Sequence, residues 1–159
     1  MRHRLRSLIA LGSALACLVG GVAAAQDKPA DSMDALREQL RTDKKALVAS
    51  VLELSQAEAK GFWPVYNAYQ GDMVSHYDRV LKLVDSYAKS YDAMTDATAT
   101  SLLKQFLSLE RDHVALLTAY LPRFEKVLPP RKIARLYQFE NKARALVNYE
   151  LARGIPLVK

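Results

Sequence analysis

The fold is decided by residues 62–91, which read FWPVYNAYQGDMVSHYDRVLKLVDSYAKSY. Large apolar or aromatic side chains recur in this stretch at gaps of three or four residues, from Phe62 to Tyr91. Most positions between them are polar, so the spacing predicts one long amphipathic helix. At about 1.5 Å per residue the helix is roughly 45 Å long, and its apolar side needs partners along that length.

The start of this long helix carries its own signals. Ser55-Gln56-Ala57-Glu58 has the pattern of a capping box, in which a serine hydroxyl and a glutamate three residues later satisfy two backbone amides. Pro64 cannot donate a backbone hydrogen bond, so we expect a kink near the beginning of the helix. Trp63, the only tryptophan, lies beside this kink and is either a core anchor or a platform for a ligand.

A shorter helix is predicted before it, over about residues 32–54. Asp31 or Ser32 can cap its first turn. Its apolar residues share one face with heptad gaps; they are Leu36, Leu40, Leu47, Val51 and Leu54. Asp43 or Lys44 fills the gap between Leu40 and Leu47, so we expect this helix to dock least tightly.

Two further helices are predicted after the long one, over about residues 95–128 and 130–153. The first of them has the widest apolar stripe, so we expect it to be the most buried. Pro129 and Pro130 end it and start the next helix, and Gly154 lies where a C-terminal cap belongs. No stretch alternates like a strand. The predicted fold class is therefore all-α, with four helices in a hairpin-like arrangement around one long kinked central helix, in a single domain over residues 32–159.

Residues 1–25 have the layout of a secretory signal peptide. Three arginines precede an apolar run that ends at Ala23-Ala24-Ala25, which predicts cleavage after Ala25 and a periplasmic protein. An uncleaved membrane anchor and acylation at Cys17 are the alternatives. Residues 26–31 then form a disordered leader. Cleavage lowers the formal charge from +6 to +3, because three arginines leave, and it removes the one cysteine. Nucleic-acid binding and cysteine chemistry are therefore disfavoured.

The remaining residues offer little chemistry. Glu110 and His113 have the Glu-x-x-His spacing of di-iron bundles. The second histidine, His76, has Met73 three residues before it, so the ligand set is incomplete. We find no nucleophile motif and no glycine-rich phosphate loop. The sequence therefore predicts no enzyme, with no catalytic residue, metal site or cofactor, and a metal-dependent oxidoreductase of the bundle type would rest on Glu110 and His113 alone.

Two groups of side chains indicate binding instead. The first is aromatic and lies on the long helix; it comprises Trp63, Tyr66, Tyr69 and Tyr77. Tyrosine is enriched at interfaces where one end of the side chain is wet, although a buried seam between helices would look similar. The second is basic and flanks the Pro129-Pro130 turn; it comprises Arg123, Lys126, Arg131, Lys132 and Arg135. Such a group can attract acidic partners or lipid headgroups, or can be a solvated helix end.

The segment Leu54-Ser55-Gln56-Ala57-Glu58 resembles the Leu-Thr-x-x-Gln motif of the Spy/CpxP family of periplasmic proteins. Ser55 replaces the threonine, and Glu58 replaces the glutamine. At the place of the family's second motif this chain has Leu128-Pro129-Pro130-Arg131-Lys132, which keeps only the leucine. The resemblance implies a curved helical hairpin that dimerises into a cradle. Some members bind zinc through histidines, which is not carried over to a chain with only His76 and His113 after residue 25.

On that resemblance we expect a periplasmic, ATP-independent chaperone or stress-response binding protein. Its expected partners are unfolded or envelope proteins, a second copy in a homodimer, and a sensor kinase or the membrane surface. The alternative is a structural envelope protein that forms a closed helical oligomer and binds no client.

Overall fold

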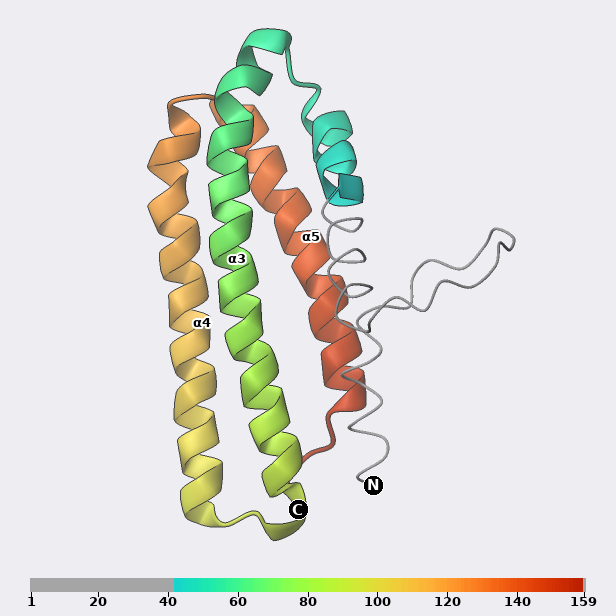
Figure 1. Ribbon diagram of the computed structural model, residues 1–159, viewed down its shortest axis with the longest axis vertical. Coiled ribbons are helices and arrows are strands. Elements are labelled where there is room, and N and C mark those ends of the chain that lie inside the picture. The colour runs from blue at the N-terminus through green and yellow to red at the C-terminus, as the bar shows by residue number, and fades with distance from the viewer. Residues whose placement is uncertain (1–41, 159) are drawn as a thin grey trace, which may run out of the picture.

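The computed structural model describes residues 42–158, which form helices joined by short turns (Figure 1). The first described residues, 42–52, are helical. They are followed by α3 (Gln56–Ser90), the short 3₁₀ helix η2 (Tyr91–Ala93), α4 (Asp96–Glu125) and α5 (Pro130–Gly154). The described part contains no strand, and α3 is its long central helix, so the predicted all-α class with four α-helices is confirmed. The predicted signal peptide and leader lie outside the described residues.

The capping box forms at the predicted position. The Ser55 hydroxyl accepts a hydrogen bond from the Glu58 amide at 3.3 Å, and the Glu58 carboxylate accepts one from the Ser55 amide at 2.8 Å. The Lys132 ammonium of α5 lies 2.8 Å from the same carboxylate. Hydrogen bonds from Lys132 and then from Ser55 lower the pKa of Glu58 to about 2. The start of α3 is therefore also a junction with α5.

We expect Ser55→Ala to lower the free energy of unfolding by about 1 kcal/mol, because the Glu58 amide loses its acceptor. Ser86→Ala is the matched control, since the Ser86 hydroxyl only donates to the Lys82 carbonyl within α3. Urea unfolding followed by far-UV circular dichroism measures both variants. An equal loss for the two would show that the cap contributes nothing of its own.

The predicted disturbance near Pro64 does not break the helix. Pro64 lies inside α3, which is helical throughout, and Figure 1 shows the first turns of α3 inclined to the rest. Gly61, in these first turns, is close to the α4–α5 turn. A Cβ atom at Gly61 would lie 3.0 Å from Val127 Cγ1, so a glycine lets α3 approach the turn this closely.

The core lies where α3, the α4–α5 turn and the helix over residues 42–52 come together. Its most completely buried side chains are Val48, Leu52, Phe62, Tyr66, Phe124 and Leu136. The described part of the first predicted helix is therefore docked in the core, whereas Leu36 and Leu40 of that helix lie outside the described residues. Val48 and Leu52 are 1% and 0% exposed, whereas Leu47 is exposed. Lys44 shares the buried face with Val48 and Leu52, and its ammonium pairs there with the Glu140 carboxylate of α5.

The expectation that the helix after the long one, α4, is the most buried is wrong. Five of its large apolar side chains are exposed: Leu103, Phe106, Leu107, Val114 and Leu121. α4 packs along α3 on one side and is joined to α5 by the Tyr137 and Arg144 side chains. Among the described elements none covers its remaining side (Figure 1). The wide stripe therefore exceeds what the neighbouring helices can bury.

The end of the chain returns to the far end of the hairpin. The Tyr87 hydroxyl of α3 donates to the Pro156 carbonyl at 2.6 Å, so the segment after α5 packs on the bundle there. Leu157, the next residue, is exposed.

Candidate functional site

The aromatic group predicted to bind clients is mostly core. Tyr66 and Tyr69 are 0% and 2% exposed, and Trp63 and Tyr77 are half-buried. Ring centroids of Tyr66 and Phe62 lie 5.2 Å apart, and those of Tyr69 and Tyr120 lie 5.3 Å apart. Burial raises the pKa of both Tyr66 and Tyr69, so their phenols are neutral. In this conformation a client cannot reach Tyr66 or Tyr69, because stacking against other rings takes up their surfaces.

A buried polar cluster lies beside Tyr66 at the edge of this core. The Glu140 carboxylate of α5 accepts hydrogen bonds from the Tyr66 hydroxyl at 2.9 Å and from Gln70 Nε2 at 3.2 Å. The Lys44 ammonium lies 2.8 Å from the same carboxylate and also donates to Gln70 Oε1. Glu140 thus joins α3, α5 and the helix over residues 42–52. Sequence reasoning missed it, although Lys44 on an apolar face was a signal that a carboxylate should lie opposite.

Two members of the basic group, Lys132 and Arg135, bind residues of neighbouring elements. Lys132 donates to the Glu53 carbonyl at 2.8 Å as well as to Glu58. Arg135 donates to the Val51 carbonyl at 3.1 Å. Both side chains therefore bind the end of the helix over residues 42–52, and Lys132 also binds the start of α3.

The other three basic residues point to solvent. The Arg123 guanidinium lies 4.6 Å from the centre of the Tyr120 ring, a cation–π distance. Arg123, Lys126 and Arg131 are exposed. The surface that an acidic partner could contact is thus smaller than the five-residue group suggested.

Among the described helices, α4 has the largest number of exposed large apolar side chains. Leu103, Leu107, Val114 and Leu121 are 58%, 46%, 60% and 39% exposed, and Phe106 is 49% exposed. Their spacing places them on one side of the helix. We call these five residues the α4 outer face. A shallow hollow beside it is lined by Leu107, Glu110, Arg111, Val114 and Ala115. The stripe resembled a core pattern in the sequence, and periodicity alone does not separate a buried stripe from an unpartnered one.

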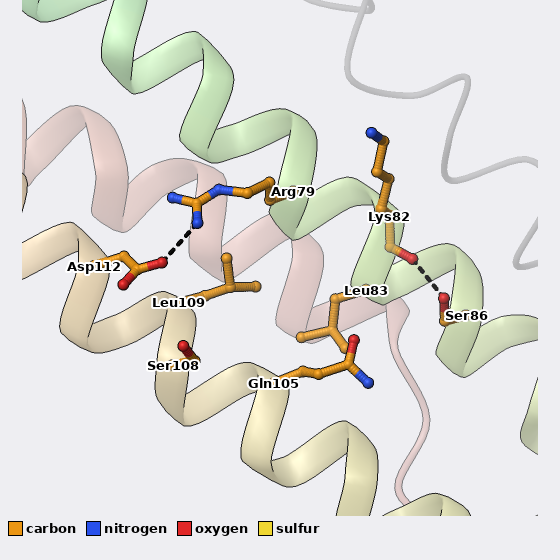
Figure 2. Close-up of a pocket in the computed structure, with 8 residues that line it drawn as sticks. All are labelled: Arg79, Lys82, Leu83, Ser86, Gln105, Ser108, Leu109 and Asp112. Atoms are coloured by element: carbon orange, nitrogen blue, oxygen red, sulfur yellow. Dashed lines mark hydrogen bonds and ion pairs between the residues drawn. The ribbon is translucent and has the colours of Figure 1, made fainter.

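A polar hollow of about 300 Å³ lies between α3 and α4 farther along the hairpin (Figure 2). Arg79 and Asp112 form an ion pair across it at 2.6 Å. Figure 2 shows the Lys82 side chain directed away from α4. Of the two cations that line the hollow, Arg79 is thus already paired with a carboxylate.

Glu110 and His113, the residues with di-iron spacing, have different partners in the structure. The Glu110 carboxylate instead accepts two hydrogen bonds from the Arg144 guanidinium, at 2.8 and 2.9 Å. His113 packs against His76 of α3, with 5.5 Å between ring centroids. Within residues 42–158 no group of three or more histidine, cysteine, aspartate or glutamate side chains could hold a metal ion.

No protein-family model matches the chain, and no curated protein or solved structure matches it. No helix in the described part of the chain is long and apolar enough to cross a membrane. The resemblance to the Spy/CpxP family accordingly stays a prediction that rests on the motif residues.

Proposed function

We propose that this chain is a periplasmic helical binding protein that holds non-native protein segments without ATP and without turnover chemistry. The observation that carries the proposal is the α4 outer face, whose five large apolar side chains are exposed along one side of a single helix. Contiguous exposed apolar strips on soluble proteins commonly mark interaction sites. The predicted signal peptide and the Leu54–Glu58 motif support the location and the class of protein.

Non-native segments fit this surface chemically. The face spans residues 103–121, which is roughly 27 Å at about 1.5 Å per residue, long enough to contact several side chains of an unfolded chain. The hollow along it is shallow and mainly apolar, so it favours apolar side chains without requiring one sequence. Lys104 and Arg111 are exposed nearby on the same helix and would speed the encounter with acidic unfolded chains.

The test is suppression of aggregation. A chemically unfolded test protein is diluted into buffer containing the chain from Gln26 to Lys159, and light scattering is followed. We expect suppression near stoichiometric ratios. Leu107→Ser combined with Val114→Ser should weaken binding of the client about 30-fold, because two large apolar contacts are lost, each worth about 1 kcal/mol when half a side chain is newly buried.

Val74→Ser combined with Leu81→Ser is the matched control on α3. These residues have the same types, lie seven positions apart like Leu107 and Val114, and are similarly exposed at 57% and 45%. The control should suppress aggregation like the wild type. Equal weakening by both double variants would show that the α4 outer face is not the binding surface. A well-folded wild type that fails to suppress aggregation at several-fold excess would contradict the proposal altogether.

The second candidate is a structural envelope protein. Burial of Tyr66 and Tyr69 favours it, because a closed aromatic core needs no client to cover it. The α4 outer face would then join copies of the chain. Sedimentation separates the two functions: a stable oligomer that dissociates on Leu107→Ser with Val114→Ser, without any suppression of aggregation, would favour the structural role.

A further inference from the structure

Two histidines meet inside the α3–α4 hairpin. The ring centroids of His76 and His113 are 5.5 Å apart, and the rings are inclined by 37°. The residues are only 3% and 6% exposed. The Nδ1 atom of each ring is buried and has no hydrogen-bond partner among the described residues. This arrangement suits two neutral imidazoles, because each charged ring would have to donate from both nitrogens.

Among the described residues, the carboxylates near the histidine pair already bind arginines. The titratable groups that face the pair come from three helices: Tyr77 and Arg79 of α3, Glu110 and Asp112 of α4, and Arg144 of α5. Both carboxylates are already paired. Glu110 binds Arg144 through two hydrogen bonds, and Asp112 binds Arg79 at 2.6 Å. A proton on His76 would therefore be repelled by the Arg79 and Arg144 guanidinium groups, and a proton on His113 by that of Arg144.

Burial opposes protonation of both rings. It lowers the pKa of His76 and of His113; the Arg79 and Arg144 guanidinium groups lower the pKa of His76 further, and Arg144 and His76 lower that of His113. Protonation also leaves an Nδ1–H group buried without an acceptor, which is costly. A second proton would add a like charge on the neighbouring ring.

The hairpin beyond the pair has fewer buried side chains than the core, chiefly Leu109 and Tyr91. The aromatic core lies on the other side of the pair, around Phe62, Tyr69 and Phe124. Beyond it, the contacts between α3 and α4 include the exposed Arg79–Asp112 ion pair and the polar hollow (Figure 2). Exposed ion pairs contribute little stability. Opening of residues 77–112 would break these contacts, the Glu110–Arg144 pair and the Tyr87–Pro156 hydrogen bond, but it would not require the aromatic core to unpack.

We propose that the His76–His113 pair is an acid-sensitive latch that keeps α3 and α4 together at neutral pH and lets residues 77–112 open as the pH falls below about 6. The latch does not depend on the proposed binding role.

The direction of the pH effect follows from linkage. Both histidines have a lower pKa in the folded state than the value near 6.5 of an unfolded chain. The closed state is fully stable above that value and loses stability as the pH falls below it. From pH 7.5 to 5.5 the opening constant can rise up to about tenfold per histidine. Glu58, with a pKa of about 2 in the folded state and 4.5 as its ordinary value, acts only at lower pH.

Hydrogen exchange read by mass spectrometry, with intrinsic exchange rates corrected for pH, tests the latch on the chain from Gln26 to Lys159. At pH 5.5 we expect amides of residues 77–112 to lose protection by up to about 100-fold relative to pH 7.5. Amides around Phe62 and Phe124 should change little. His76→Phe with His113→Phe keeps two packed rings and removes both protons, so the extra pH dependence of residues 77–112 should vanish.

Nuclear magnetic resonance titration of the carbon-bound ring protons gives a second readout in the wild type. Both histidines should titrate below 6.5, whereas in guanidinium chloride they should titrate near 6.5. Equal pH dependence of exchange in the wild type and the double variant would overturn the latch. A pKa at or above 6.5 for either histidine in the folded protein would overturn the latch as well. This titration tests the latch even if the double variant does not fold.

Discussion

Replacing Phe124 by alanine is expected to lower the free energy of unfolding by about 3–5 kcal/mol. Phe124 is 0% exposed, and its ring lies 5.8 Å from Tyr69, 6.0 Å from Phe62 and 6.3 Å from Tyr137, measured between centroids. It therefore joins α3, α4 and α5 at one point. A domain of this size has about 5–15 kcal/mol in total, so the variant should be marginally folded. Urea unfolding followed by circular dichroism measures the loss.

Phe106→Ala is the matched control for this prediction. Phe106 lies on the same helix but is 49% exposed, and alanine has the higher helix propensity, so we expect a change below about 1 kcal/mol. A loss at Phe106 as large as that at Phe124 would mean that the α4 outer face is covered in solution. A small loss at Phe124 would contradict the packing of the aromatic core.

Glu140→Ala is expected to lower the free energy of unfolding by about 3 kcal/mol. The change leaves the buried Tyr66 hydroxyl without its acceptor and the Lys44 ammonium without its counterion. Glu150→Ala is the control on the same helix, because Glu150 forms only an exposed pair with Arg153. We expect the control to lose less than about 0.5 kcal/mol in the same urea experiment.

A double-mutant cycle that combines Glu140→Ala with Tyr66→Phe measures how much of this loss of stability comes from the Tyr66–Glu140 hydrogen bond. In the wild type, removing the hydroxyl should destabilise the protein, because the carboxylate loses a donor. In the Glu140→Ala background it should be neutral or stabilising, since it removes an unsatisfied group. Additive effects of the two substitutions would rule out the hydrogen bond that joins them.

The sequence predicted the helices well because their signals are local. The period of three and four residues from Phe62 to Tyr91 depends only on backbone geometry, and α3 covers most of that stretch. Ser55, Thr95 and the Pro129-Pro130 pair mark helix ends through bonds to amides within one turn or through a fixed backbone angle. Such signals do not depend on which helices are neighbours in the fold.

The distribution of burial could not be predicted, because it depends on which helices become neighbours. Tyr66 and Leu107 both occupy apolar stripes, yet one is fully buried and the other is half exposed. Lys44 interrupted a stripe in the sequence and forms a key contact in the structure, because Glu140 of α5 lies opposite. The proposed binding surface and the histidine pair also come from such pairings. The roles in client, kinase or membrane contact stay predictions.

The Lys44–Glu140 pair also bears on the order of folding. It joins residues 96 positions apart, whereas α3 and α4 follow one another and can zip together from the turn between them. The helix over residues 42–52 docks on α5, the last of the described helices. During synthesis, the Lys44 ammonium therefore has no carboxylate partner, and the face with Val48 and Leu52 lacks the α5 part of its packing, until α5 is complete. Incompletely packed apolar surface of this kind favours aggregation.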